Sequence, residues 1–479
     1  MRVSYGIDFG TTNSAGVMLQ EDQVYELGDS TGRPLPSIVA IDKATGRMSA
    51  GREVWDTREE RAKSGREFVV QSVKRYLGKD YRWHTNAGVF TPEDVAAKIF
   101  EQVGEQVRLR KAPAMTRAAV TIPVGFPANA RAALRRAARS AGIDVSTFIH
   151  EPTAALVRYL RKVRNHQYVA VFDWGGGTLD ISVLKLRDNR VFELATRGVA
   201  QAGDDIDSAL ARAVHTREFK KRDDARSFDN IATRDQDQLR TRCEVAKCEM
   251  SARDETEILV QSYGGEDPLD FRVTRQFFDG LVGPFVDRAI DLLADAVMAA
   301  NISFEGLDGL LVIGGTSNLQ LLREKLFNDD RFNSALESSD APEWDVALGA
   351  AVVDRMPSGY EIVESVGLVL CDETFHPLVH PGEKAYSEEK TIAVSLVEDV
   401  AQANIVLAKA DSPTGSGPRK RAFQFQVPTA GFDGERIELA YAISEDLTFR
   451  MKARSETRGQ SYEVCHEYED LRFAYHIDE

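Results

Sequence analysis

Two stretches of the chain contain the residue types that proteins use to hold phosphate groups. Glycine, threonine and aspartate gather in residues 6–12, Gly-Ile-Asp-Phe-Gly-Thr-Thr, and again in residues 172–180, Phe-Asp-Trp-Gly-Gly-Gly-Thr-Leu-Asp. Each stretch follows an apolar run and precedes another one, at residues 15–19 and 181–186. We therefore expect two hairpins whose turns present backbone N–H groups. Two such turns that face each other predict a phosphate clamp.

The aspartates beside these glycines predict a bound cation. A carboxylate next to a phosphate is repelled unless a hydrated divalent cation lies between them, and Mg²⁺ is held through one or two carboxylates, water and phosphate oxygens. Asp8, Asp173 and Asp180 therefore indicate a magnesium–nucleotide site. A single Gly-Thr turn would more simply be a plain hairpin. The repetition, together with a third glycine turn at residues 312–317, favours the nucleotide site.

Length and composition set broad limits on the protein. A chain of 479 residues exceeds one ordinary hydrophobic core, so two to four domains or subdomains are expected. The hydrophobic content of 43% and charged content of 28% are typical of a soluble globular protein. A net charge of −15 speaks against a nucleic-acid partner. The four cysteines and eight histidines show no zinc spacing, so magnesium is the only metal expected.

The sequence contains no apolar run as long as a membrane span requires. Residues 1–4 lead directly into a predicted strand and do not resemble a signal peptide. We therefore expect a cytoplasmic protein without a membrane partner.

The order of predicted elements indicates an α/β fold in the first three quarters of the chain. Residues 1–45 alternate apolar and polar positions as a β-meander does. Strands and helices then alternate through two halves, which predicts an α/β protein of duplicated design. The helices are expected at residues 91–110, 129–141, 235–253 and 343–353, and the strands at 117–122, 146–149 and 309–315.

The pattern changes after residue 357. Short runs of alternating hydrophobicity separated by turn residues predict an all-β module, with strands at 391–396, 404–409, 422–427, 436–443 and 447–453 and a flexible loop at 413–418. We expect an α/β domain over residues 1–357, a linker at 358–366 and the β module at 367–479.

Taken together, these motifs resemble the DnaK-like 70-kilodalton heat-shock chaperones of the actin and sugar-kinase ATPase superfamily. Residues 6–14, 172–182 and 312–317 look like the three phosphate turns of that family, and residues 73–78, Val-Lys-Arg-Tyr-Leu-Gly, are similar to its catalytic-lysine segment. Residues 121–123, Arg131 and residues 151–155 follow at the family's spacing. The resemblance implies a duplicated actin-like, ribonuclease H-like ATPase domain of two lobes, followed by a peptide-binding β-sandwich. The helical lid of the family is not expected here, because no long amphipathic segment follows the predicted strands.

The resemblance also implies catalytic roles. Lys74 would lie beside the γ-phosphate, and Asp180 would position or help to deprotonate the attacking water. Glu151 would act behind these two groups, and Thr178 would donate a hydrogen bond to phosphate. An ordinary surface lysine is the alternative interpretation of Lys74 alone.

Nucleotide and metal contacts are implied in the same way. Asp8 and Asp173 would hold Mg²⁺ largely through water. A structural ion pair is the alternative for Glu244 and Lys247. The residues expected to contact the nucleotide are Gly10, Thr11, Thr12, Gly175, Gly176, Gly177, Gly203, Glu244, Lys247, Ser251, Gly314, Gly315 and Glu343.

Two further residues are expected to take part in communication between the domains, and three more are candidates for peptide binding. Pro123 and Arg131 match a proline and an arginine that relay nucleotide state in the family, although Pro123 could equally end a strand. Phe375, Ile392 and Ile405 are candidates for the peptide groove, and they could equally belong to the sandwich core.

The chain departs from the family pattern at several positions. Cys248 and Asn318 stand where many relatives have arginines, and Ala202 replaces the glycine before Gly203. The linker segment 360–364 is also less apolar than the family's linker. Base contacts and the coupling between domains are therefore expected to be looser.

These observations predict an ATP-dependent, chaperone-like ATPase that hydrolyses ATP to ADP and phosphate and so controls the binding of extended or unfolded polypeptide. A J-domain co-chaperone or a nucleotide-exchange factor is the implied partner. One alternative is a slow or non-hydrolysing nucleotide-switched scaffold or partner-exchange protein. A small-molecule kinase of the same superfamily is the other.

Overall fold

The structure of the chain is a computed structural model. It describes residues 3–21, 23–160, 162–163, 165–221, 226–265, 268–332, 336–337, 343–355, 360–385, 388–411, 419–457 and 460–476. The predicted boundary at residues 357–358 and the predicted loop at 413–418 lie outside these described residues.

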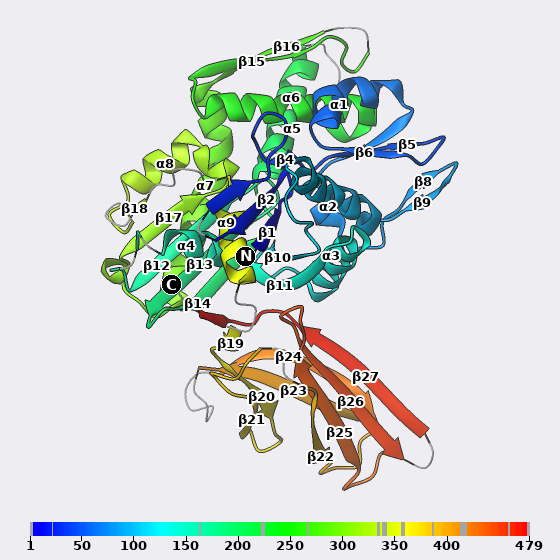
Figure 1. The fold of residues 1–479 in the computed structure, drawn as a ribbon, viewed down its shortest axis with the longest axis vertical. Helices are drawn as coiled ribbons and strands as arrows, with labels where there is room; N and C mark the ends of the chain where they lie inside the picture. The colour runs from blue at the N-terminus through cyan, green and yellow to red at the C-terminus, as the bar shows by residue number, and fades with distance from the viewer. Residues whose placement is uncertain are drawn as a thin grey trace.

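The first lobe is built on a sheet that begins with the predicted N-terminal hairpin (Figure 1). Strand β1 (Val3–Phe9) pairs antiparallel with β2 (Asn13–Gln20) and parallel with β10 (Arg117–Ile122), and β10 pairs parallel with β11 (Asp144–His150). Smaller strands extend or flank this sheet: β3 (Gln23–Glu26), β4 (Leu35–Pro36), β5 (Val39–Asp42), β6 (Met48–Ala50), β7 (Glu67–Val70), β8 (Trp83–Thr85) and β9 (Gly88–Phe90).

Three helices and one 3₁₀ turn complete the first lobe. They are α1 (Arg52–Ser64), η1 (Val73–Tyr76), α2 (Pro92–Leu109) and α3 (Ala128–Ser140). The predicted start of α2 is confirmed, because Thr91 and Asp94 form a reciprocal capping box there.

The second lobe repeats this arrangement. Strand β12 (Tyr168–Trp174) pairs antiparallel with β13 (Leu179–Arg187) and parallel with β17 (Gly309–Ile313), just as β1 pairs with β2 and β10. The predicted duplication of an α/β design is therefore confirmed. The other elements of this lobe are β14 (Arg190–Val199), α5 (Gly203–Lys221), η2 (Phe228–Asn230), α6 (Thr233–Met250), β15 (Glu255–Val260), β16 (Leu269–Thr274), α7 (Arg275–Ala299), η3 (Phe304–Gly306), η4 (Gly315–Asn318), α8 (Gln320–Phe327) and β18 (Leu336–Glu337).

Helices α4 (Glu151–Tyr159) and α9 (Asp345–Asp354) lie between the two lobes, and their backbones are in contact with each other. A Cβ atom added to Gly349 of α9 would lie 1.7 Å from the carbonyl oxygen of Ala154 in α4. A Cβ atom on Gly6 of β1 would lie 2.1 Å from the carbonyl oxygen of Ala347. Glycine at these two positions lets α9 pack directly on β1 of the first lobe and on α4, which in turn contacts β12 and β13 of the second lobe.

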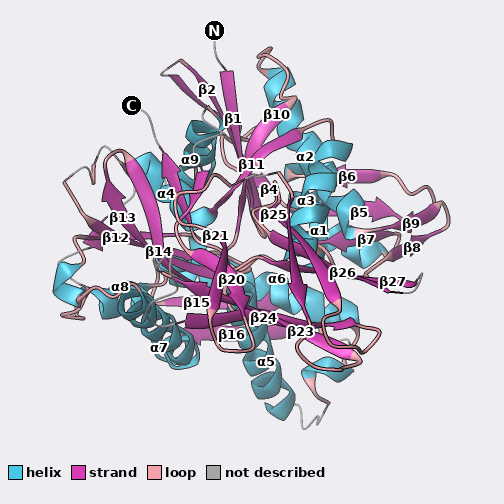
Figure 2. Ribbon diagram, turned by 90° about the horizontal axis from the view of Figure 1, so that it is seen from below, coloured by secondary structure: helices cyan, strands magenta, loops and turns pink. Residues whose placement is uncertain are grey.

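The C-terminal quarter forms two four-stranded antiparallel sheets, as the sequence predicts. One sheet has the order β21-β20-β23-β24 and the other β22-β25-β26-β27. Figure 2 shows helices in the two lobes, while the described part of this sandwich consists of strands and loops. The strands are β20 (Ser365–Val369), β21 (Phe375–Val379), β22 (Lys390–Ser395), β23 (Gln402–Ala410), β24 (Arg419–Pro428), β25 (Arg436–Ile443), β26 (Phe449–Thr457) and β27 (Gln460–Tyr468).

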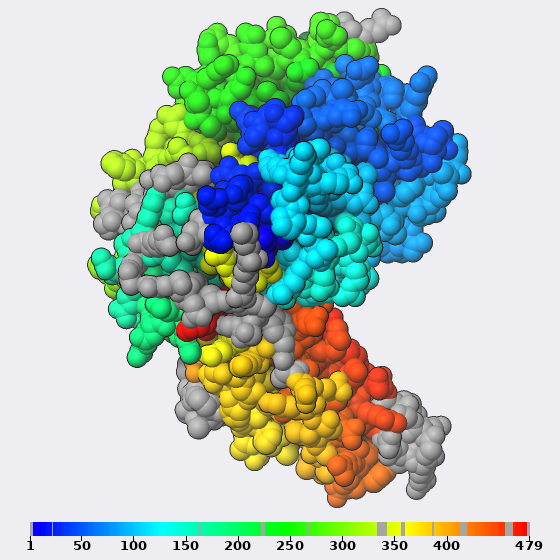
Figure 3. All heavy atoms as spheres, viewed as in Figure 1, coloured from blue at the N-terminus to red at the C-terminus, as the bar shows by residue number. Residues whose placement is uncertain are grey.

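Both ends of the sandwich return to the second lobe. Strand β28 (Phe473–His476) pairs antiparallel with β14, and β19 (Tyr360–Ile362) pairs with the other edge of β28. The rings of Tyr360 and Tyr475 meet at 4.6 Å between centroids, and both residues are buried. The division predicted from the sequence places residues 473–476 within the β module, whereas their pairing extends the sheet of the second lobe. In Figure 3 the sandwich projects from the lobes as a separate mass.

The contact between α4 and α9 leads to a stability prediction. Gly349→Ala should lower the free energy of unfolding by roughly 3 kcal/mol, because the added methyl group meets the rigid backbone of Ala154 in α4. Gly104→Ala in α2 is the matched control: no atom lies within 4 Å of its added Cβ, so it should stabilise the helix by about 1 kcal/mol. Thermal melts of the two variants would measure this, and equal melting temperatures would contradict the described packing.

Candidate active site

Three glycine turns converge where the two lobes meet. A Cβ atom on Gly176 would lie 2.2 Å from Oγ1 of Thr12, and one on Gly177 would lie 2.2 Å from Oγ1 of Thr11. The third turn joins them, since Oγ1 of Thr316 donates a hydrogen bond of 2.7 Å to the carbonyl of Gly175. Only glycines allow the second turn to approach the two threonines this closely.

The third turn also approaches an aspartate that is predicted to hold magnesium. Gly314 has φ +86°, and a Cβ atom there would lie 2.6 Å from Oδ1 of Asp173. No atom of the described residues lies within 4 Å of the corresponding position on Gly315, so that glycine borders open space in the part of the chain that the structure describes. In the first turn, a Cβ on Gly10 would lie 2.0 Å from the carbonyl oxygen of Asn13. Backbone crowding therefore accounts for Gly10 and Gly314, but not for Gly315.

One lysine and several carboxylates lie beneath these turns. The 3₁₀ turn η1 directs Lys74 inward, and its Nζ lies 2.5 Å from Oε1 of Glu151, the first residue of α4. The exposed fractions of these two residues are only 6% and 8%. Oδ1 of Asp8 accepts a hydrogen bond of 2.8 Å from Thr121, and Oδ1 of Asp180 accepts one of 2.7 Å from the N–H of Val124.

This concentration of negative charge shifts the pKa values of the cluster. Burial and the neighbouring Glu151 raise the pKa of Asp8 to about 6 and that of Asp180 to about 8. The same two causes raise the pKa of Asp173 well above its usual value. Burial lowers the pKa of Lys74, but the carboxylates of Glu151, Asp8 and Asp180 outweigh it and raise that pKa overall.

The residues of this cluster suit a hydrated magnesium ion bound to phosphate. Oδ2 of Asp180 is buried and has no hydrogen-bond partner among the described residues, so it can accept a bond from a ligand. Among the residues that the structure describes, no three acidic, histidine or cysteine side chains converge to hold a metal ion by themselves. A site of one or two carboxylates is what Mg²⁺ uses when phosphate and water complete its coordination.

Cavities open on both sides of the contact between the turns. One of about 890 Å³ is lined by Thr11, Lys74, Gly177 and Thr178, and it extends toward the sandwich. Another of about 620 Å³ is lined by Thr11, Thr12 and Glu244 and extends between α1 and α6. The turns thus lie between two spaces large enough for a ligand.

The helix predicted to bind adenosine, α6, lies beside the second cavity. Glu244 lines this cavity, whereas Lys247 and Ser251 are bonded to other groups of the protein. Nζ of Lys247 lies 2.7 Å from Asp207 of α5 and donates to the carbonyl of Gly203 at 3.1 Å, so its ion pair is with Asp207 and not with Glu244. Oγ of Ser251 donates to the carbonyl of Lys247 at 3.4 Å. Glu343 is exposed before α9 and is absent from the described lining of the cavities above.

The predicted relay residues connect the cluster to the sandwich. The N–H of Val124, directly after Pro123, binds Asp180. Arg131 has an exposed fraction of 0%, and burial lowers its pKa to about 10. Its guanidinium donates to the carbonyls of Phe126 in the first lobe and of Asp446, Leu447 and Glu469 in the sandwich.

The three groove candidates lie at different depths in the sandwich. Ile405 is buried in the main core, and Ile392 is half-buried against it. Phe375 belongs to a smaller cluster with Ala408 and Ala410. The alternative that these residues belong to the sandwich core therefore fits Ile405 better than Phe375.

Sequence reasoning missed two residues that tie the site together. Arg75 donates to the carbonyl of Gly177 at 3.0 Å and to Asp205 at 2.9 Å, so it joins the lobes across the cleft. Its position directly after Lys74, in the predicted catalytic segment, is the feature of the sequence that could have indicated this role. Glu193 of β14 accepts hydrogen bonds from Thr153 and from the N–H of Phe473 in β28, and no local pattern predicts these contacts.

Comparisons with known proteins agree with this geometry. The family model described as Hsp70 protein matches residues 82–378, which is more than half of the chain. Proteins named Chaperone protein DnaK from Thermotoga neapolitana, Thermotoga petrophila and Thermotoga maritima are each 27% identical over 483 residues. Each alignment covers 95% of this chain and 78% of the relative. None of the described helices is long and apolar enough to cross a membrane.

The raised pKa of Asp180 predicts a pH-dependent stability. The folded ligand-free protein keeps this proton up to about pH 8, whereas the unfolded chain releases it near the ordinary aspartate pKa of 3.8, so stability falls as pH rises between these values. Asp180→Asn should remove that dependence and gain about 1.4 kcal/mol over wild type for each pH unit in this window. Urea unfolding at several pH values would measure the difference. The exposed Asp295→Asn on α7 is the control, and a constant gap between Asp180→Asn and wild type would disprove the shift.

Proposed function

Because this chain belongs to the Hsp70 protein family, we propose that it is an ATP-driven chaperone that hydrolyses Mg-ATP to control the binding of extended or unfolded polypeptide. The observation that carries this proposal is the buried pair of Lys74 and Glu151 among the carboxylates beneath three converging glycine turns. The division into an ATPase domain at 1–357, a linker at 358–366 and a peptide-binding sandwich at 367–479 is part of the proposal, as is a cytoplasmic location.

Phosphate binding would use the turns and the lysine. Backbone N–H groups of the turns and the hydroxyls of Thr11, Thr12 and Thr178 would donate to phosphate oxygens. The ammonium group of Lys74, held in place by Glu151, would offset the charge of the transferred phosphoryl group. Bound Mg²⁺ would supply further positive charge beside Asp8 and Asp173.

Asp180 is suited to receive a proton from the attacking water. Its Oδ1 is fixed by the N–H of Val124, which leaves Oδ2 as the oxygen able to accept. A pKa of about 8 in the ligand-free protein is close to the operating pH, which favours proton transfer. Thr178 lowers the pKa of this carboxylate and would help to hold it in place.

Nucleotide binding would require the two main turns to separate, since Thr11 and Thr12 contact Gly177 and Gly176 directly. Arg75 and Ser72 of the first lobe bind Asp205 and Asp204 of the second, so separation would strain or break these bonds. The bound state of the triphosphate would therefore be linked to the angle between the lobes.

The same movement can reach the sandwich. Asp180 holds the loop after Pro123, and Arg131 farther along this segment binds three sandwich carbonyls. A shift of that loop would change the docking of the sandwich and hence its affinity for peptide. A J-domain co-chaperone and a nucleotide-exchange factor are proposed partners from the family relationship alone.

The attachment of the sandwich through both β19 and β28 favours a second candidate function, a slow nucleotide-switched scaffold. Two strands paired with a lobe limit how far the sandwich can move during a cycle. The pairing of Lys247 with Asp207 favours the same candidate, because it occupies a group expected to bind ribose.

The catalytic role of Lys74 is testable by substitution. Lys74→Ala should retain Mg-ATP but slow hydrolysis by roughly 10²–10³-fold, the usual loss when one charge-stabilising donor is removed. Single-turnover hydrolysis and calorimetric ATP binding would separate the two effects. Lys79→Ala, an exposed lysine five residues along, is the control. Hydrolysis at the wild-type rate in Lys74→Ala would refute the assigned role, and ATP binding without measurable turnover in wild type would favour the scaffold.

The relay through Arg131 is testable by its effect on coupling. An unfolded polypeptide should accelerate ATP turnover of the wild-type protein, and Arg131→Lys should lose most of this acceleration, because an ammonium group cannot reproduce the planar fork of donors. Basal turnover should persist. Arg136 lies on the same helix as Arg131 and forms an exposed ion pair with Glu93 of α2, and Arg136→Lys should behave as wild type. Full acceleration in Arg131→Lys would contradict the relay.

A further inference from the structure

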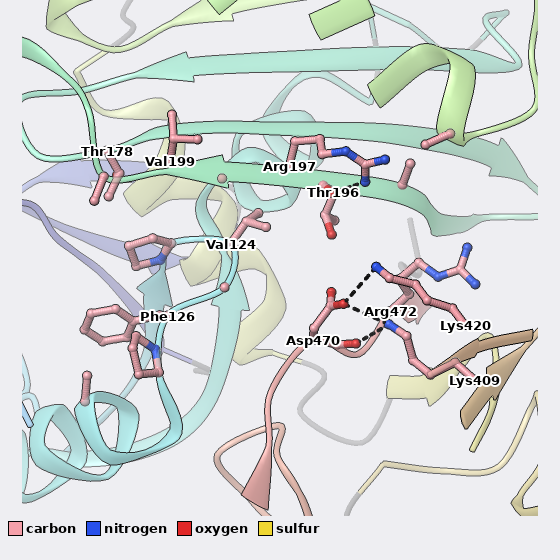
Figure 4. Close-up of a pocket in the computed structure, with 18 of the residues that line it drawn as sticks. Val124, Phe126, Thr178, Thr196, Arg197, Val199, Lys409, Lys420, Asp470 and Arg472 are labelled. Carbon is pink, nitrogen blue, oxygen red and sulfur yellow. Dashed lines mark hydrogen bonds and ion pairs between the residues drawn. The ribbon is translucent and has the colours of Figure 1, made fainter. Parts of the chain in front are cut away.

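The cavity of about 890 Å³ extends well beyond the phosphate turns. Its lining combines residues 123–127 of the first lobe, residues 194–200 of the second and parts of the sandwich. Figure 4 shows Thr196 and Arg197 on β14 facing a group of sandwich and C-terminal side chains, Lys409, Lys420, Asp470 and Arg472. A triphosphate bound at the turns would reach only one end of this space, because Thr11, Lys74, Gly177 and Thr178 lie at that end.

The cavity is positively charged in an acidic protein. Eight lysine and arginine residues line it against three carboxylates, although the chain as a whole carries a net charge of −15. Lys409, Lys420 and Arg472 are balanced by Glu364, Asp470 and Asp411. Lys74 and Arg75 are paired with Glu151 and Asp205, which lie outside the lining. Among the described residues, Lys79 and Arg197 have no carboxylate within ion-pair distance. Excess positive charge in a partly enclosed space attracts an anionic ligand.

The wall formed by β14 is an incompletely paired strand edge. On this side β14 pairs with β28 only through Arg190, Val191 and Phe192, within the described residues. Beyond that point the carbonyl of Leu194 accepts a hydrogen bond from Arg472 at 2.6 Å, and the carbonyl of Thr196 accepts one from Arg197 at 2.8 Å. Side chains thus provide donors that a neighbouring strand would otherwise supply.

The chain itself demonstrates that this edge accepts an added strand. β28 comes from 280 residues farther along the sequence and pairs with the first part of the same edge, with Phe473 bonded to Glu193. The residues just before β28, 469–472, do not continue the pairing with β14. In this segment the N–H of Leu471 bonds to the carbonyl of Glu469, and the N–H of Arg472 bonds to Glu364. Residues 194–199 of β14 therefore face the cavity and not a strand.

We propose that this cavity binds an extended, acidic segment of a partner protein, which adds as a strand to residues 194–199 of β14 in line with β28. Backbone groups of the segment would pair with the β14 edge and replace the guanidinium of Arg197 at the carbonyl of Thr196. The released Arg197, together with Lys79, would pair with glutamate or aspartate side chains of the segment. This site is separate from a peptide groove within the sandwich.

Fluorescence anisotropy with a labelled heptapeptide of alternating valine and glutamate would test this proposal on the full-length protein. The peptide should bind, and Arg197→Glu should weaken binding by roughly tenfold or more, as reversal of a close charge pair does. Arg288→Glu, an exposed residue of α7 away from the cavity, makes the same charge change and should leave the affinity unaltered. Lys79→Glu should also weaken binding, and it provides a second variant if Arg197→Glu does not fold.

Two further probes separate strand addition from simple charge attraction. The same peptide with alternate amides methylated should lose binding, because it cannot pair along one edge. The corresponding valine–lysine peptide should not bind. Equal binding of the methylated peptide, equal affinity in wild type and both cavity variants, or no binding at all would overturn the proposal. Binding of inorganic phosphate that is lost in Arg197→Glu without any peptide binding would also overturn it and would identify a small-anion site.

Discussion

The burial of one lysine among four carboxylates beneath the glycine turns is the constraint on which the rest of the structure depends. Removing so many like charges from water is costly unless protons, cations or hydrogen bonds compensate them. In the ligand-free protein, Lys74 balances Glu151, while burial raises the pKa values of Asp8, Asp173 and Asp180 toward protonation. A metal–phosphate ligand supplies an alternative balance, so ligand binding and the protonation of this cluster are linked.

Sequence patterns predicted the local architecture well, because it depends on short-range signals. Glycine turns between apolar runs, the cap at Thr91 and the change to short alternating runs all correspond to elements of the structure. Contacts between distant segments were not predictable in this way. The strand β28 is four residues long, and Phe473 at its start lies 280 residues after Glu193 of its partner β14, so nothing local specifies their pairing. The same holds for Lys247, whose choice of Asp207 over Glu244 depends on how α5 packs against α6.

Glu193 illustrates how the long-range contacts add to the site. It is fully buried, and its carboxylate accepts hydrogen bonds from Thr153 in α4 and from the backbone of β28, while Nδ1 of His150 lies 2.9 Å away. His150 directly precedes Glu151, the partner of Lys74. The N-terminal end of α4 therefore contacts both the charged cluster, through Glu151, and Glu193, which holds β28. Through the carboxylate of Glu193, the first lobe, the second lobe and the C-terminal strand are linked.

The attachment of the sandwich through two neighbouring antiparallel strands has a mechanical consequence. Because β19 and β28 are neighbours in one sheet, the sandwich is carried on a two-stranded stem and not on a single flexible tether. A single tether permits free swivelling, whereas a hydrogen-bonded ribbon resists twisting about its length and bends mainly across its flat face. Rotation of the second lobe would therefore tilt the sandwich in one preferred direction.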